Sequence, residues 1–192
     1  MSGLATYVVE PRISRFQVQA FAGGLLSALG HNPVFAIRGL VGDASVRQDS
    51  MEDASLILRV DATSLHLVDD VSERDREEIE YHMHRDVLET DRFPEILFVT
   101  DRVDVLDKSQ EPVSLNLDGN VTLHGQTRAQ IIPAKVSVQQ GFLRAFGNFS
   151  IWQSDYNIRL VSVAGGTLKI KDELKLNFDI VARRLHDNSV EP

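Results

Sequence analysis

The 192-residue sequence predicts an all-β domain in which about eight antiparallel strands close into a barrel, with one main helix. Three observations support this fold class. Apolar and polar residues alternate along most of the chain, turn residues separate the alternating runs, and a single segment carries strong helix signals. The pattern fits a barrel or a sandwich. We favour a closed barrel because an open sheet with unprotected edges would pair with other chains.

The strands are predicted from alternation with a period of two residues, which is typical of half-buried antiparallel strands. The clearest run is 113–123, where every second residue is apolar or glycine, and 174–182 repeats the pattern. The other predicted strands are residues 16–21, 34–47, 56–61, 95–105, 127–138 and 142–152. Gly125 and Gly141 favour hairpin turns, and loops are predicted at Asp53 and at residues 107–110.

One segment departs from this alternation and predicts a helix. Ser72 and Asp75 form a capping box at its start, about four turns follow to roughly Leu88, and Pro94 prevents further extension. A second, short helical turn is predicted within residues 22–32. One side of the main helix carries a narrow apolar stripe at four-residue spacing, made of Ile79, Met83 and Val87.

Length and composition favour one domain, residues 1–185, followed by a flexible polar tail, residues 186–192. The formal net charge is −8 and the longest basic run is Arg183–Arg184, which argues against a nucleic-acid partner. The absence of cysteine excludes disulfides, thiolate metal sites and cysteine nucleophiles. The sequence opens without a signal-peptide pattern, and no apolar stretch reaches the ~20 residues of a membrane span. We therefore expect a soluble cytoplasmic protein without stable membrane insertion.

Motifs for catalysis are absent: there is no nucleophile elbow, phosphate-binding loop or dinucleotide fingerprint, and we expect no cofactor. The six histidines are the candidate metal ligands. His82 and His84 would lie about 200° apart on a helix and could not hold one ion together. His124 precedes Gly125 in a turn, where it either fixes the turn or contacts a ligand at the barrel mouth. The remaining enzyme hypothesis is a metal-dependent catalyst that uses His31, His82, His84 or His124.

Apolar side chains are the strongest remaining signal. Nine phenylalanines are distributed among the predicted strands, and they either fill a core or line a tunnel. An eight-stranded barrel has an interior that side chains can fill or that holds one small ligand. A long apolar chain gains ~0.8 kcal/mol for each buried CH₂ group. A site for such a chain therefore needs length and apolar walls rather than motif residues.

Four segments, in the same order, resemble the YceI-like family of lipocalin-like polyisoprenoid-binding bacterial proteins. The likeness covers about residues 6–183 and implies an eight-stranded antiparallel barrel, with a helix near one end and a cavity for a long apolar chain. The segments are Tyr7-Val8-Val9-Glu10-Pro11 with Ser14-Arg15-Phe16, Arg92-Phe93-Pro94-Glu95-Ile96-Leu97-Phe98, Val121-Thr122-Leu123-His124-Gly125-Gln126-Thr127-Arg128, and Ser154-Asp155-Tyr156-Asn157-Ile158 with Lys171-Asp172-Glu173-Leu174-Lys175-Leu176.

The sequence departs from the family pattern at three points. Ile13 replaces a histidine of the opening motif, so a polar ligand contact from that position is lost. Asn157 replaces a glycine but can still adopt a positive φ. The signal peptide of the exported family members is not visible. In addition, residues 25–33 look like a subgroup feature whose role the sequence does not indicate.

We therefore predict non-enzymatic binding, storage or transport of a long apolar ligand in the barrel cavity, in particular a polyisoprenoid, an isoprenoid quinone or a fatty amide. The helix stripe would close one end of the barrel. The alternative is a ligand-free structural or stress-response module with a packed barrel, as a monomer or a homodimer. The predicted ligand-binding residues are Phe16, Val18, Leu58, Ile79, Met83, Val87, Phe98, Leu117, Val121, Phe146, Phe149 and Phe178.

Overall fold

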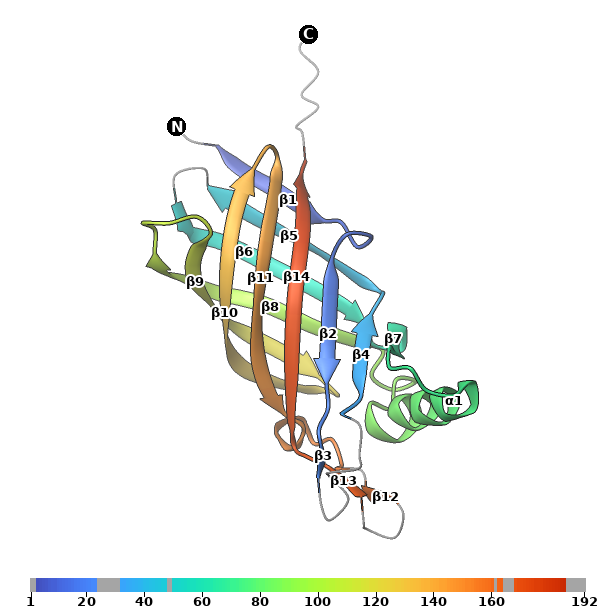
Figure 1. The fold of residues 1–192 in the computed structure, drawn as a ribbon. Coiled ribbons are helices and arrows are strands. Elements are labelled where there is room, and N and C mark those ends of the chain that lie inside the picture. The colour runs from blue at the N-terminus through green and yellow to red at the C-terminus, as the bar shows by residue number, and fades with distance from the viewer. Residues whose placement is uncertain (1–2, 24–31, 48–49, 161, 164–167, 186–192) are drawn as a thin grey trace.

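The computed structural model describes residues 3–23, 32–47, 50–160, 162–163 and 168–185 (Figure 1). Eight antiparallel strands form a closed barrel, because β1 pairs with both β5 and β14. This confirms the predicted fold class. In spatial order the barrel strands are β1 (Leu4–Val9), β5 (Leu40–Arg47), β6 (Ser50–Asp61), β8 (Glu95–Asp107), β9 (Val113–Leu123), β10 (Gln126–Gln139), β11 (Phe142–Trp152) and β14 (Glu173–Arg184).

Shorter strands extend the sheet beside β14. The strand β2 (Arg15–Gln19) pairs with β14, β4 (Val34–Ile37) pairs with β2, and β7 (Leu65–Leu67) pairs with β4. Figure 1 shows β11, β14 and β2 in the front wall of the barrel and β5, β6 and β8 behind them. Two short 3₁₀ helices, η1 (Ala62–Ser64) and η3 (Gln153–Tyr156), follow β6 and β11. A small three-stranded sheet lies below the barrel and consists of β3 (Ala22–Gly23), β12 (Ser162–Val163) and β13 (Leu168–Ile170).

The main helix begins where the capping box predicts. In α1 (Glu73–His82), the hydroxyl of Ser72 accepts a hydrogen bond from the Asp75 backbone N–H at 3.2 Å and donates one to the Asp75 carboxylate at 2.7 Å. The helix continues as a π-helical turn, η2 (Met83–Val87), and ends near Leu88 as expected. A π turn is wider than an α turn, so the regular four-residue spacing of the apolar stripe is lost after Met83.

Several boundaries differ from the prediction. The predicted strand 34–47 is divided between β4 and β5. Asp53 lies inside β6 rather than in a loop, because β6 is twice as long as the alternating run 56–61. Of the predicted helical turn, Ala22–Gly23 form β3, and residues 24–31 lie outside the described part of the chain. The predicted tail, residues 186–192, also lies outside it. None of the helices that the structure describes has the length and hydropathy needed to cross a membrane.

Candidate functional site

The candidate site is an apolar cavity of about 180 Å³ inside the barrel. Its wall is formed by side chains from all eight barrel strands, together with β2, β4, β7 and the segment that follows η2. Ser55 is the only lining residue with a polar side chain, and apolar atoms make up the surface that faces the cavity. The cavity therefore offers a ligand an apolar surface and no group that could pair with a charge.

The alternation of the strands places the lining residues, because cross-strand partners point to the same face of a sheet. Leu58, Phe98 and Val121 are successive partners across β6, β8 and β9. On the opposite wall, Phe16 of β2 is the partner of Phe178 of β14. All five side chains are buried and line the cavity.

The structure brings eight of the twelve predicted residues together in the cavity wall. They come from β2, β6, β8, β9, β11 and β14, which are far apart in the sequence. These eight residues are Phe16, Val18, Leu58, Phe98, Leu117, Val121, Phe149 and Phe178.

The three residues of the helix stripe do not reach the cavity. Met83 is 8% exposed and belongs to the hydrophobic core, and Ile79 and Val87 pack against that core. The only residue of this helical segment in the wall is Leu88, which follows the π turn. The expectation that the stripe lines the site is therefore corrected: the stripe attaches the helix to the barrel.

Phe146 lies on the outer face of β11. Its neighbours Ala145 and Phe149 line the cavity, and a residue three positions from Phe149 points to the opposite face of a regular strand. The Arg144 guanidinium lies 5.5 Å from the centre of the Phe146 ring, and it also donates two hydrogen bonds to the carboxylate of Asp179. The prediction that Phe146 lines the cavity was wrong because it ignored this alternation.

Many lining residues were not predicted individually. Leu115 alternates in register with Leu117 on β9, and Ile132, Leu143 and Ile151 occupy the inward positions of β10 and β11. The same period-two pattern that predicted the strands would have found them. Leu88 has no such signal, because its place in the wall depends on the π turn before it.

Three phenylalanines form an aromatic cluster in the front wall. The Phe178 ring lies 6.2 Å from Phe16 and 6.3 Å from Phe149, measured between ring centres. Gly147, the partner of Phe178 on β11, leaves room for this cluster. A Cβ atom at Gly147 would lie 3.0 Å from the Phe178 ring and 2.4 Å from the backbone oxygen of Pro133.

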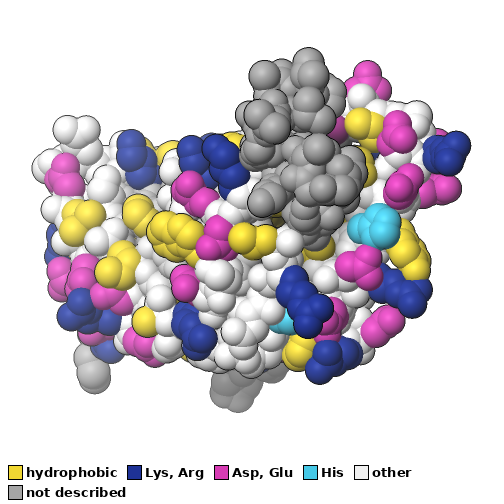
Figure 2. Space-filling view, turned by 90° about the horizontal axis from the view of Figure 1, so that it is seen from below, with side chains coloured by type: hydrophobic (Ala, Val, Ile, Leu, Met, Phe, Trp, Pro, Cys, Tyr) yellow, Lys and Arg dark blue, Asp and Glu magenta, His cyan; other side chains and the backbone are white. Residues whose placement is uncertain are grey.

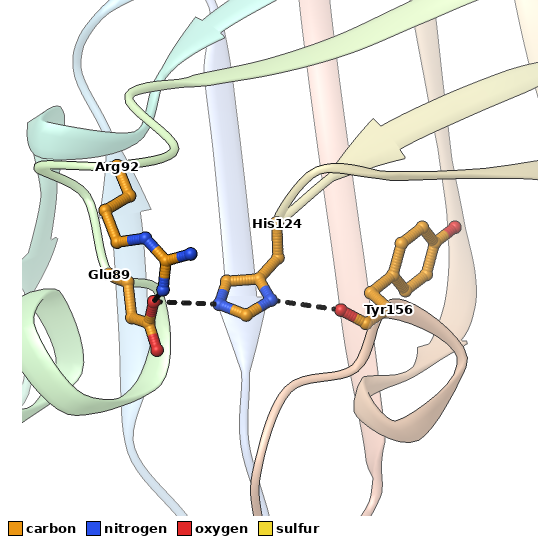
Figure 3. Close-up of polar contacts among 4 residues, drawn as sticks. All are labelled: Glu89, Arg92, His124 and Tyr156. Carbon is orange, nitrogen blue, oxygen red and sulfur yellow. Dashed lines mark hydrogen bonds and ion pairs between the residues drawn. The ribbon is translucent and has the colours of Figure 1, made fainter.

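His124 fixes the turn between β9 and β10 (Figure 3). It has a φ of 51°, and its Nδ1 lies 3.1 Å from the carbonyl oxygen of Tyr156. Its ring lies 4.4 Å from that of Phe93, and its Nε2 is 4.0 Å from the carboxylate of Glu89, which also receives a hydrogen bond of 2.5 Å from Arg92. This cluster links the end of the helical segment to η3, so the turn-fixing interpretation of His124 is confirmed. His124 is not among the residues that line the cavity.

The histidines on the helical segment have separate partners. His82 contacts the carboxylate of Asp86 at 2.6 Å, and His84 contacts the carbonyl oxygen of Leu65 at 3.0 Å. Within the described ranges, no three His, Asp or Glu side chains are placed to hold a metal ion. His31 lies outside those ranges.

The two substitutions in the family motifs have different structural settings. Ile13 is 57% exposed in the connection between β1 and β2, so this position is not in the cavity wall. Asn157 ends η3 with a φ of 57°, which confirms that it adopts the backbone conformation expected of the glycine it replaces. Burial raises the pKa of the adjacent Tyr156, Asp155 adds to that rise, and Arg128 opposes it.

A closed eight-stranded antiparallel barrel around one apolar cavity is a lipocalin-like architecture. The chain belongs to the YceI-like family, because the model of the YceI-like domain matches residues 7–182. This confirms the resemblance found in the four sequence segments.

Solved structures with the same fold cover between 79% and 95% of the chain. BcnA of Burkholderia cenocepacia has a TM-score of 0.71 at 15% identity, and the match covers 90% of this chain and 98% of that one. A polyisoprenoid binding domain from Saccharophagus degradans has a TM-score of 0.64 at 13% identity, with 95% and 100% covered. The YCEI protein of Campylobacter jejuni has a TM-score of 0.64 at 16% identity, with 79% and 85% covered. The search of curated proteins found no significant match.

Proposed function

We propose that this protein binds a long apolar ligand inside the barrel and stores or transports it without catalysing a reaction. The observation that carries the proposal is the apolar wall of the cavity, to which eight of the predicted residues contribute. The ligand classes that fit this wall are a polyisoprenoid, an isoprenoid quinone and a fatty amide. The description of the Saccharophagus degradans domain as polyisoprenoid binding supports the first of these.

The size of the cavity supports a chain rather than a compact molecule. A water-sized group needs roughly 10–15 Å³ of such space, so 180 Å³ accommodates on the order of 12 to 18 groups of that size. Each buried CH₂ group contributes about 0.8 kcal/mol before the costs of immobilisation. An alkyl or prenyl segment of this length would gain enough to bind without any polar contact.

The absence of polar groups at the cavity surface supports a binding role over an enzymatic one. A catalyst needs a nucleophile, a proton donor or a charged group beside the reacting atoms. The only polar side chain among the lining residues is that of the exposed Ser55. We further propose that residues 1–185 act as one domain in the cytoplasm, as a monomer or a homodimer.

Native mass spectrometry of protein purified from bacterial cells tests the proposal directly. We expect a bound lipid-like mass, which organic extraction then releases for identification. A protein that is purified empty and takes up neither an isoprenoid quinone nor a fatty amide on titration would contradict the proposal. That result would favour the alternative, a packed structural or stress-response module.

A pair of neighbouring substitutions separates binding in the cavity from binding on the surface. Ala145 lines the cavity and Phe146 lies on the outer face of the same strand. We expect Ala145→Trp to fill the cavity and weaken binding of a fatty amide by at least about tenfold, because an indole displaces several chain carbons. Phe146→Trp is the matched control and should bind normally. Thermal denaturation checks that both variants are folded, and equal affinities in two folded variants would exclude the cavity as the site.

A further inference from the structure

One stretch of the barrel wall has no hydrogen-bonded ladder. The strands β10 and β11 pair only between Lys135–Gln139 and Phe142–Phe146. The preceding residues of β10, 126–134, have register partners on β9, and the following residues of β11, 147–152, have register partners on β14. Every residue of both segments belongs to the described part of the chain. We call the boundary between these two segments the β10–β11 seam.

The residues at the top of the seam explain why the ladder stops there. Pro133 has no backbone N–H and cannot donate to β11. Opposite it, Gly147 approaches so closely that a Cβ atom would lie 2.4 Å from the Pro133 carbonyl oxygen. The two backbones therefore touch at this point and are not held together by paired residues below it.

The inner face of β10 changes from polar to apolar along the seam. Arg128 is the register partner of the cavity-lining Val121, so it lies on the inner face, yet its side chain is exposed. Two residues on, Gln130 is half-buried, and after a further two residues Ile132 is 6% exposed and lines the cavity. The side chains of Arg128 and Gln130 donate hydrogen bonds only to adjacent backbone carbonyl oxygens, at 2.9 and 3.2 Å. The boundary between solvent and cavity therefore crosses β10 between Gln130 and Ile132.

The outside of the seam has exposed apolar side chains beside polar ones such as Thr127 and Asn148. Ile131 of β10 is 57% exposed and Trp152 of β11 is 49% exposed. Figure 2, which views the molecule from below, shows hydrophobic side chains in a band on that side of the surface. An apolar chain that approaches the seam would meet apolar side chains before it reaches the cavity.

Another part of the wall where a ladder stops, between β6 and β8, is tied by side chains. The ladder between β6 and β8 ends at Ile57 and Val99, but the next residue, Thr100, accepts a hydrogen bond from the Leu56 N–H at 2.7 Å. It also donates one to the Leu56 carbonyl oxygen at 3.3 Å. Further along, Lys108 and Glu52 form an ion pair of 2.6 Å. No side-chain hydrogen bond or ion pair joins residues 126–134 to residues 147–152, all of which the structure describes.

We propose that the β10–β11 seam is the entrance through which the apolar ligand reaches the cavity. This inference rests on the proposed function and adds the route of entry. Opening a paired part of the wall would break ladder hydrogen bonds and leave their donors and acceptors unsatisfied. Opening the seam requires only that side chains such as Ile132 and Phe149 move aside, because they line the cavity at this boundary.

Crosslinking tests the route, and the chain is suited to it because it has no cysteine of its own. One variant carries Ala129→Cys and Trp152→Cys, which lie on the two sides of the seam. The matched control carries Ala129→Cys and Asn120→Cys, which are register partners in the ladder between β9 and β10. In each variant, the two cysteines are crosslinked with the same short bifunctional thiol reagent. Stopped-flow fluorescence then measures uptake and release of cis-parinaric acid, a fluorescent fatty acid, before and after crosslinking.

We expect the crosslink across the seam to slow uptake and release together by about tenfold or more, with an unchanged Kd, because a route affects rates and not the equilibrium. The control crosslink should leave both rates unchanged. Unaltered rates in the seam-crosslinked protein, or equal slowing in the control, would overturn the proposed entrance while leaving the cavity as the binding site. If the wild-type protein takes up neither this probe nor a fatty amide, the proposed function itself is wrong and the proposed entrance is wrong with it.

Discussion

Tyr156 is the largest of the fully buried side chains and holds η3 against the base of the barrel. Its carbonyl oxygen receives the contact from His124, and the residue is 1% exposed. Burial raises the pKa of its phenol because the phenolate would lose its hydration. The folded protein therefore keeps this proton at a pH where the unfolded chain has begun to lose it.

This difference predicts a loss of stability at alkaline pH. With a raised folded pKa, the contribution of Tyr156 is fully present below the unfolded value, at about pH 10, and is lost as the pH rises through the folded value. Urea denaturation at a series of pH values should therefore show a steeper alkaline loss of unfolding free energy in wild type than in Tyr156→Phe. Tyr81→Phe, at a residue that is 51% exposed, is the control and should follow wild type. Identical slopes in all three proteins would contradict the prediction.

Gly147 gives a second prediction at the scale of one residue. A Cβ atom there would meet the Pro133 carbonyl oxygen at 2.4 Å and the Phe178 ring at 3.0 Å. We expect Gly147→Ala to lower the free energy of unfolding by about 1–3 kcal/mol, as overpacking does elsewhere. Gly3→Ala is the control, because nothing lies within 4 Å of its Cβ position. Denaturant titration of both variants provides the measurement, and equal midpoints would show that the two strands can separate to accept a methyl group.

Phe146 shows what residue-level reasoning from the sequence can and cannot do. The pattern of β11 predicts the strand correctly, and the same pattern assigns inward positions to Ala145 and Phe149. Hydrophobicity alone does not distinguish Phe146, whose ring instead lies beside the exposed Arg144 guanidinium. The alternation of a strand, applied strictly, is more informative here than the aromatic character of a side chain.

At the scale of elements, the helical segment supports the barrel, and Leu88 at its end is its only residue in the cavity wall. Residues of α1 are half-buried or exposed, and Met83, at the start of the π turn, is the buried contact. We expect Met83→Ala to cost about 2–5 kcal/mol of unfolding free energy, as buried methionine truncations do. The Kd for a fatty amide should stay within about twofold of wild type, because the side chain does not line the cavity.

Two measurements on the same protein samples check this prediction. Thermal denaturation reports the stability, and isothermal titration calorimetry below the transition reports the affinity. Glu77→Ala, at an exposed position of α1, is the control and should change neither quantity. A Met83→Ala variant that is as stable as wild type but binds the fatty amide weakly would show that Met83 contributes to the ligand site.

The sequence predicts the elements better than it predicts their junctions. The capping box at Ser72 predicts the start of α1, and His124-Gly125 predicts the hairpin between β9 and β10. The sequence has no comparable signal for the π turn or for β7, which has only three residues and pairs with the four-residue β4. Such features depend on contacts with distant segments, and the alternation of apolar and polar residues along the chain does not predict them.

At the scale of the whole molecule, the closed barrel predicts how affinity depends on chain length. Each added CH₂ group should improve the Kd of a straight-chain primary amide by roughly fourfold, which corresponds to about 0.8 kcal/mol. The improvement should stop near 12 to 18 carbons, when a cavity of about 180 Å³ is filled. Calorimetric titration with a homologous series gives the slope and the plateau. An affinity that is independent of chain length would show that the ligand binds outside the cavity.

The closed barrel itself is predicted by the sequence, whereas the β10–β11 seam is not. The alternation is disturbed in the lower half of the two strands, where Arg128 lies on the inner face and the apolar Ile131 and Trp152 are exposed, but such departures do not show by themselves that the pairing stops half-way. Pro133 is a further local signal, but proline is also common on ordinary edge strands. Closure of a barrel depends on all strands together, and a local gap in it therefore emerges only from the assembled structure.

The apolar wall has a further consequence for any preparation of this protein. A cavity without hydrogen-bonding groups ranks its occupants by the carbon they bury and scarcely by the identity of their head groups. Under the proposed function, the cargo recovered from cells would be a mixture that mirrors the abundance of long-chain lipids in the host. The composition of that mixture would reflect the lipids available in the host as much as the binding preference of the protein. To measure the preference alone, the bound lipid is removed and the protein is reloaded from an equimolar mixture of competing lipids.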